Sequence, residues 1–347
     1  MNSPTLKKLL CAFILVVFAL IWGLLPDAVQ AQRQDKPIEE QEEKPQGRTT
    51  LSIAVEQVQV DITVQDKNGN LIQGLRKEHF RVYEEKVEQT VTFFTPVEAP
   101  ITAILVTEYS SVIPWEWLYE AWLGSHMFAD QMRPEDWVAV VAYDIRPEIL
   151  VDFTQNKAEV YNALRKLNSP AFRESNLYDA VYDVIDRVQD VEGKVAMVLI
   201  SSGLDTFSKK TLDQIMDKVK EANVVIYPIS LGGNARVRND YGTSEGVDFL
   251  SLTRMDLYQA EAVLKYFAKY TGGVAFFPRF VQAYKGVFQT ISALLRSQYS
   301  LGYVSTNTKK DGKYRKIKIE VVADVDGDGK PDKLKVHYRE GYSVKKG

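Results

Sequence analysis

Hydroxyl and acidic side chains follow two apolar stretches that have the composition of buried β-strands. Glu108, Ser110 and Ser111 come directly after the apolar run Ile101 to Val106, and the stretch KVAMVLISSGLD, residues 194 to 205, ends in two serines and Asp205. In a parallel α/β sheet, ligands bind at the carboxyl ends of the strands. Two such ends on neighbouring strands predict a site lined by oxygen atoms, which are the ligands that Mg²⁺ and Ca²⁺ prefer.

A second acidic cluster lies near the C-terminus, in the stretch DVDGDGKPD. Its carboxylates have the spacing of the first part of an EF-hand calcium loop, at Asp324, Asp326, Asp328 and Asp332. Gly329 stands where such a loop turns sharply, but Lys335 stands where a full loop has a bidentate Glu. The spacing predicts a weak calcium site, whereas a Gly-rich hairpin turn between two strands fits the same residues equally well. Calcium is therefore the cation we expect first, and magnesium second.

The elements that would position the first cluster alternate between strand and helix patterns after Pro100. Strand patterns occupy residues 101–107, 137–144, 148–153, 194–201, 223–231 and 274–277. Helix patterns occupy residues near 114–131, 156–167, 176–190, 208–221, 256–271 and 280–297. Such alternation predicts the α/β class, with a doubly wound, mostly parallel sheet covered by helices on both faces.

Both flanks of this region have period-two patterns typical of antiparallel β-structure. On the N-terminal side the strand patterns are Val58 to Val64, Leu71 to Leu75, Phe80 to Tyr83 and Gln89 to Phe94. On the C-terminal side they are Tyr299 to Val304, Arg315 to Val322 and Lys333 to Tyr342. We expect the two flanks to form one small β-sandwich into which the α/β domain is inserted.

The N-terminus has the layout of an export signal. Lys7 and Lys8 precede an apolar run from Leu9 to Leu25, and small residues at Val29 and Ala31 suit cleavage by signal peptidase. An uncleaved membrane anchor is the rival interpretation, because the run approaches the shortest length that spans a bilayer. Cleavage near Ala31 would leave no membrane span and would remove Cys11, the single cysteine of the chain.

The composition bounds the remaining function classes. The chain has 347 residues, 45% of them hydrophobic and 26% charged, with a net charge of -3. This is the balance of an ordinary globular protein with a sizeable core, and nothing in it indicates a nucleic-acid partner. The sequence has no nucleophile and base pair, no His-rich ligand set and no phosphate-binding glycine loop, so we expect no enzyme.

Several motifs carry a resemblance to a known family. NLYDAVYDV at 176–184, KVAMVLISSGLDTFSK at 194–209 and ANVVIYPISLG at 222–232 resemble a von Willebrand factor type A domain. The segments VQVDITVQDKNGNLIQGLRKEHFRVYEEKVEQTVTFF at 58–94 and RSQYSLGYVSTN at 296–307 are similar to the flanks of VWFA-related proteins found especially in Acidobacteria. The resemblance covers residues 50 to 343, nearly the whole mature chain, and implies a type A fold, which is Rossmann-like, for the region between the two flanks.

The resemblance also implies a metal-ion-dependent adhesion site, from which this sequence departs. Glu108 stands at the first Asp of the family's motif and Ser110 matches its first Ser, whereas Val112 replaces the second Ser. Ser175 stands at the position of the Thr, and Ser202 at that of the second Asp. Magnesium commonly takes one or two carboxylates in octahedral geometry, and Glu108 alone would supply the charge here.

These departures favour a degenerate site in which the serines cap helices and Glu108 is solvated. Asp205, three residues beyond Ser202, would rescue cation binding only if its loop turned the carboxylate inward.

We therefore divide the chain into a signal peptide (1–31), a linker (32–49), an N-terminal β module (50–97), a type A-like domain (98–297) and a C-terminal β segment (298–347) that packs with the N-terminal module. The expected function is that of an exported, periplasmic or extracellular, protein-binding module of the adhesion type. It would bind its partner through the loops at 108–117, 173–176 and 202–207. The alternatives are a structural or assembly component of the cell envelope and, less favoured, a metal-dependent hydrolase.

Overall fold

The computed structural model describes residues 57–97, 100–111, 113–167, 172, 174–191, 195–233 and 254–344. These residues all belong to one compact unit, Ala54–Gly347. The expected signal peptide, the linker and Val112 lie outside the described residues.

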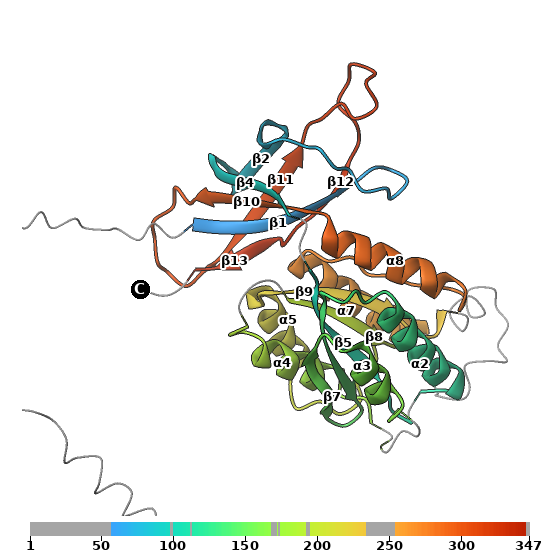
Figure 1. Ribbon diagram of the computed structural model, residues 1–347. Helices are drawn as coiled ribbons and strands as arrows, with labels where there is room; N and C mark the ends of the chain where they lie inside the picture. The colour runs from blue at the N-terminus through green and yellow to red at the C-terminus, as the bar shows by residue number, and fades with distance from the viewer. Residues whose placement is uncertain are drawn as a thin grey trace, which may run out of the picture. The chain divides into compact units, whose positions relative to one another are not determined.

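A five-stranded sheet, ordered β7-β6-β5-β8-β9, forms the centre of the α/β domain (Figure 1). Its strands are β5 (Thr102–Glu108), β6 (Trp137–Tyr143), β7 (Pro147–Thr154), β8 (Val195–Ser201) and β9 (Val224–Ser230). All pairs are parallel except that of β6 with β7, which is antiparallel. The predicted fold class, a mostly parallel α/β sheet, is confirmed.

Helices cover both faces of this sheet because its central strands are apolar on both faces. In β5, Ala103 and Leu105 pack on one face, and Ile104 and Val106 on the other. The first face is covered by α2 (Trp115–Asp130), α3 (Lys157–Leu164) and α8 (Ala283–Arg296). The second is covered by α4 (Leu177–Arg187), α5 (Leu212–Glu221) and α7 (Arg254–Thr271). Each strand therefore alternates between two cores, as the period of two requires.

Segments from both ends of the described chain form two antiparallel sheets, ordered β12-β1-β10-β4 and β13-β11-β2-β3. The early strands are β1 (Gln57–Gln65), β2 (Phe80–Glu84), β3 (Val87–Gln89) and β4 (Val91–Val97), with the short 3-10 helix η1 (Lys77–His79) before β2. The late strands are β10 (Gln298–Val304), β11 (Tyr314–Val321), β12 (Lys335–His337) and β13 (Gly341–Ser343). Val60 of β1 lies opposite Leu301 of β10, and the two sheets share one apolar core.

Two predicted strands are absent from the described residues. Of the stretch 71–75, Leu71 alone makes an isolated bridge, to Gln65, and of 274–277 Phe276 alone makes one, to Ile229. Each stretch follows a glycine at positive φ, Gly69 in the turn after β1 and Gly272 at the C-terminal end of α7 (Arg254–Thr271).

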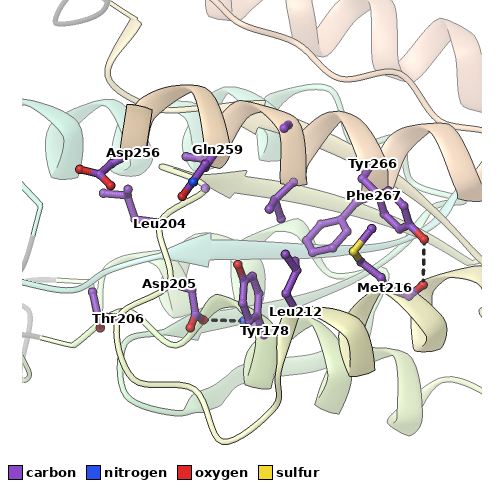
Figure 2. A pocket seen from close by; sticks show the side chains of 14 residues that line it. Tyr178, Leu204, Asp205, Thr206, Leu212, Met216, Asp256, Gln259, Tyr266 and Phe267 are labelled. Atoms are coloured by element: carbon purple, nitrogen blue, oxygen red, sulfur yellow. Dashed lines mark hydrogen bonds between the residues drawn. The ribbon is translucent and has the colours of Figure 1, made fainter. Parts of the chain in front are cut away.

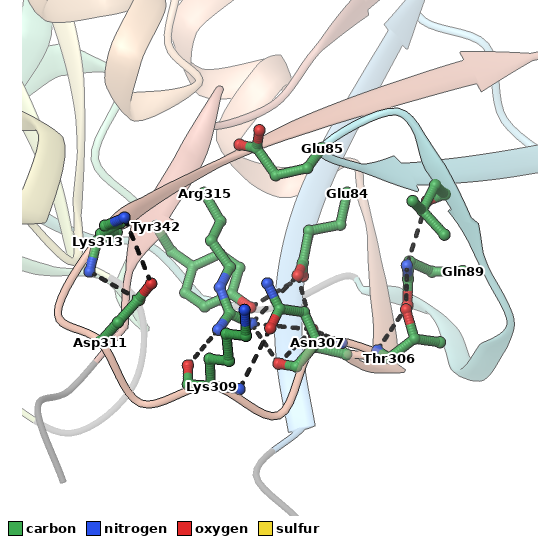
Figure 3. Close-up of polar contacts among 12 residues, drawn as sticks. Glu84, Glu85, Gln89, Thr306, Asn307, Lys309, Asp311, Lys313, Arg315 and Tyr342 are labelled. Carbon is green, nitrogen blue, oxygen red and sulfur yellow. Dashed lines mark hydrogen bonds and ion pairs between the residues drawn. The ribbon is translucent and has the colours of Figure 1, made fainter.

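A buried ion pair joins β2 to β11 inside the sandwich (Figure 3). Arg315 Nη1 lies 3.2 Å from Glu84 Oε1, and both side chains are at most 5% exposed. The Tyr303 and Tyr342 hydroxyls each donate to Glu84 Oε2 at 2.9 Å, and the Ser305 hydroxyl donates to Oε1 at 2.6 Å. A buried charge pair is tolerated only when its remaining hydrogen-bonding capacity is satisfied, which these hydroxyls achieve.

Candidate functional site

Glu108, the last residue of β5, lies at the carboxyl end of the sheet and is completely buried. The Ser175 hydroxyl, just before α4, donates to Glu108 Oε1 at 2.8 Å. The Ser202 backbone N–H, just after β8, donates to Oε2 at 2.6 Å. The carboxyl group thus connects three loops at the end of the sheet where ligands bind in parallel α/β folds.

Tyr143, the last residue of β6, completes the surroundings of Glu108 Oε2. Its hydroxyl lies 2.8 Å from Ser201 Oγ, and both hydroxyls lie 3.3 Å from Glu108 Oε2. Burial raises the pKa of Glu108, against the hydrogen bonds from Ser202, Ser175 and Tyr143, which lower it. Burial beside the Glu108 charge also raises the pKa of Tyr143 well above its usual range. Both groups are thereby biased toward their neutral forms.

The prediction that Glu108 is solvated is wrong, because three protein donors replace water around its carboxyl group. Ser110, the one residue that matches the adhesion-site motif outright, is buried, and its hydroxyl has no hydrogen-bond partner among the described residues. The predicted ligands Glu108, Ser110, Ser175 and Ser202 are all fully buried at this end of the sheet.

This set does not fit a magnesium ion. Mg²⁺ requires near-octahedral oxygen ligands at about 2.1 Å, with one or two carboxylates. One oxygen of Glu108 accepts the Ser202 N–H and the other accepts the Ser175 O–H, so both point at donors rather than at a common cation position.

Asp205 does not bring the missing charge to this set. Its Oδ1 accepts the Tyr178 backbone N–H at 3.0 Å and the Ser208 hydroxyl at 2.6 Å. Tyr178 is in the first turn of α4, so the carboxylate lies at the positive end of that helix. The alternative in which the loop turns Asp205 toward Glu108 is therefore wrong, because the start of α4 and Ser208 each offer its carboxylate a donor elsewhere.

Two exposed aromatic side chains lie close in sequence to Ser175 and Ser202, the residues that bond to Glu108. Phe172 is 43% exposed and Phe207 is 73% exposed. Both line an open depression of about 700 Å³ that also contains Asn176 and Tyr182. The Ser111 backbone N–H donates to the Phe172 carbonyl at 2.8 Å, and this hydrogen bond joins the backbone at Phe172 to the loop after β5.

The first turn of α2 adds another aromatic side chain to the carboxyl-end loops. Trp115 is 66% exposed whereas Trp117 is 6% exposed. Residues two apart on a helix point in different directions, so these two side chains do not both face the core. Phe207 ends the predicted partner-binding loop 202–207, whereas Phe172 lies just before the predicted loop 173–176 and outside any periodic element.

The acidic loop after β11 brings three of its four predicted ligands together. One carboxylate oxygen from each of Asp324, Asp326 and Asp332 lies within 4.8 Å of the others. Asp328 is outside this group, and its Oδ1 accepts the Lys330 N–H at 2.8 Å. Among the described residues, this is the one group of three or more acidic, His or Cys side chains whose ligand atoms converge.

Comparisons with known proteins find similar solved structures alone. No family model matches the chain, and no curated protein matches it. Solved structures similar to it include an aerotolerance-related membrane protein from Bacteroides fragilis (15% identity, 56% of this chain and 99% of that one, TM-score 0.40). Another is a von Willebrand factor type A protein from Catenulispora acidiphila (10% identity, 76% and 72%, TM-score 0.41).

A third similar structure is the vWF domain of the type V pili tip protein Mfa5 from Porphyromonas gingivalis (22% identity, 34% and 44% coverage, TM-score 0.30). The solved structures similar to this chain thus include type A domains, as the sequence motifs predict. Scores this low carry no argument about activity or partner. In the part of the chain that is described, no helix has the length and apolar character needed to cross a bilayer.

Proposed function

We propose that this protein is an exported, non-enzymatic binding module that engages a protein partner through the carboxyl-end loops without a bound cation. The observation that supports this most is that Glu108 is buried and hydrogen-bonded, whereas Phe172 and Phe207 are exposed and line one depression together. In an adhesion site, a cation would bridge the loops to the partner. Here the Glu108 carboxyl connects the loops through hydrogen bonds within the protein. Contact with a partner is then made by the exposed side chains of Phe172 and Phe207.

Phe207 and Phe172 are the side chains best suited to that contact. Large aromatic groups dominate binding energy at protein interfaces when a partner's pocket desolvates them. Phe207 leaves nearly three-quarters of its surface in water at 73% exposure, so association gains the free energy of burying it.

The experiment is capture of envelope proteins by the immobilised full chain, with and without a chelator. We expect the same partner in both conditions, and a loss of capture by the double variant Phe172→Ala, Phe207→Ala. A hot-spot aromatic contributes about 2 kcal/mol or more, which corresponds to roughly 30-fold in affinity. The matched control is Phe93→Ala on β4, since Phe93 is also exposed, at 42%.

Each failure has a distinct meaning. Capture by Asp326→Ala that is still lost with chelator would show a cation-dependent site outside the acidic loop and would refute the internal role of Glu108. Capture that survives the double variant but is lost by Phe93→Ala would favour the alternative, an assembly component that docks through its β module. Turnover of ester or phosphate substrates would overturn the non-enzymatic assignment. Export is tested by the mass of the mature protein, which we expect to begin near Gln32.

A further inference from the structure

The depression of about 700 Å³ that Phe172 and Phe207 line also contains charged side chains of both signs. The basic ones are Arg146, in the turn between β6 and β7, Lys209 and Lys210. The acidic ones lie one turn apart along α4, at Asp179, Asp183 and Asp186. The charges that remain for a partner are those that are not already paired within the protein.

Two of the acidic side chains form ion pairs within the chain. Asp183 Oδ2 lies 2.5 Å from Arg187 Nε. Asp186 Oδ1 lies 2.7 Å from Lys218 Nζ. Neither carboxylate needs a cation from a partner.

The third acidic side chain, Asp179, holds the segment that carries two of the basic ones. Its carboxylate oxygens accept the backbone N–H groups of Lys209 and Lys210, at 2.9 and 2.8 Å. Lys210 Nζ lies 4.0 Å from the centre of the Tyr182 ring, as in a cation–π contact. This wall of the depression is therefore formed before a partner arrives, which reduces the ordering cost of binding.

Two basic side chains have no such partner. Arg146 and Lys209 are exposed, and neither makes an ion pair with a described carboxylate. Lys209 also lies two positions from the exposed Phe207, so a cationic and an aromatic side chain come from one short segment. An anionic group that enters the depression is attracted by both free cations and displaces no existing partner.

The aspartates of α4 limit the kind of anion that fits. A nucleic acid or an anionic lipid surface would bring many negative charges against Asp179, Asp183 and Asp186, and such like-charge contacts are costly. A peptide carries its carboxylates at separate positions and can add an apolar side chain for the aromatic rings to cover. The combination of two free cations and two exposed aromatic rings thus favours a peptide over a polyanion.

We propose that the partner presents an acidic peptide segment to this depression. An Asp or Glu of the partner lies beside Arg146 and Lys209, and an adjacent apolar side chain packs against Phe172 and Phe207. This inference rests on the proposed protein-binding function and adds the chemistry of the segment that is bound.

The test compares three acetylated, amidated pentapeptides that differ in charge alone. They have the sequence Gly-Asp-Phe-Asp-Gly or the same sequence with Asn or Lys in place of both Asp, and the Phe carries a para-fluorine. Fluorine transverse relaxation of the peptide in the presence of the full chain measures binding. We expect the Asp peptide to bind with a Kd on the order of 1 mM, because it makes few contacts.

The Asp peptide should bind about 5-fold more tightly than the Asn peptide, which is about 1 kcal/mol, since two exposed ion pairs contribute up to about this much. The Lys peptide should bind no more tightly than the Asn peptide. At about 1 M NaCl, where the Debye length is about 3 Å, the difference between the Asp and Asn peptides should disappear.

The double variant Arg146→Glu, Lys209→Glu should reverse the preference, so that the Lys peptide binds more tightly than the Asp peptide. Both residues are exposed, so the fold should tolerate the change. The matched control is Lys285→Glu, Lys310→Glu, which alters net charge equally at two exposed residues outside the lining and should keep the preference of the wild type.

Three results would overturn the proposal: equal binding of the three peptides, a preference for the Asp peptide that survives in Arg146→Glu, Lys209→Glu, or a reversal that also occurs in the control. Retention of the wild type on phosphatidylglycerol vesicles, lost in Arg146→Glu, Lys209→Glu but not in the control, would assign the two cations to a lipid surface and would also overturn it. Envelope capture that depends on Phe172 and Phe207, together with equal binding of the peptides, would refute this inference and leave the proposed function standing.

Discussion

Replacement of Glu108 by Ala should destabilise the α/β domain far more than replacement by Gln. Ala leaves the Ser175 hydroxyl and the Ser202 N–H without their acceptor in a buried site. Each unpaired buried donor costs about 1–3 kcal/mol, so two donors cost about 4 kcal/mol. At about 2–4 °C per kcal/mol for a domain of this size, Tm should fall by roughly 8–16 °C.

Gln keeps the volume and most of the hydrogen bonds. Its carbonyl oxygen can accept the Ser202 N–H, while its amide donates to the Ser175 hydroxyl. We expect a loss below about 1.5 kcal/mol, the net value of one neutral hydrogen bond. The assay is thermal and urea unfolding of wild type, Glu108→Ala and Glu108→Gln, followed by circular dichroism.

The same variants test the direction in which the fold shifts the pKa of Glu108. Burial raises the pKa of Glu108 in the folded protein above its ordinary value of 4.5. The folded state then holds the proton more tightly than the unfolded state does, so this contribution is complete below the unfolded pKa and is lost as pH rises through the folded pKa. The stability of wild type relative to Glu108→Gln should therefore fall from pH 4.5 toward alkaline pH. Two results would refute a neutral Glu108 carboxyl that is bonded within the protein. One is an equal loss of stability in Glu108→Ala and Glu108→Gln, and the other is a stability of wild type relative to Glu108→Gln that rises with pH.

Three further predictions follow from the other sites. Millimolar Mg²⁺ or Mn²⁺ should leave Tm within about 1 °C, since stabilisation grows only as RT ln(1 + [L]/Kd) and Kd should exceed the concentration used; a shift that Glu108→Ala abolishes would contradict this. Calorimetric titration should show calcium binding with a Kd on the order of 0.1–1 mM. Binding should be lost in Asp326→Ala but only weakened in Asp328→Ala, because Asp328 lies outside the converging group. If the wild type shows no heat of binding, the loop is a hairpin turn without a calcium site. Glu84→Gln should cost about 3–5 kcal/mol by leaving the buried Arg315 without its carboxylate, whereas the same change at the neighbouring exposed Glu85 should cost less than about 1.5 kcal/mol in urea unfolding.

Local patterns in the sequence determined the fold class. The run from Ile101 to Val106 is apolar at every position but Thr102, so both faces of that strand had to be covered, and the period of the flanking helices supplied the cover. Trp115 and Trp117 are two apart on a helix, so the sequence alone required them to face different surroundings. Such features depend on near neighbours along the chain and are therefore readable from it.

The candidate site depended on the tertiary structure. Ser175 and Ser202 lie 67 and 94 positions from Glu108, so nothing near Glu108 in the sequence shows that its carboxyl group finds donors and is buried. The Asp205 carboxylate could have turned toward Glu108, but the Tyr178 N–H at the start of α4 binds it instead (Figure 2). A cavity of about 620 Å³ is likewise lined by α5 and α7 (Figure 2), whose residues meet only because both helices pack on one face of the sheet. Periodicity fixes which residues are buried, but the free energy of a polar site depends on which distant donors and charges the fold places around it.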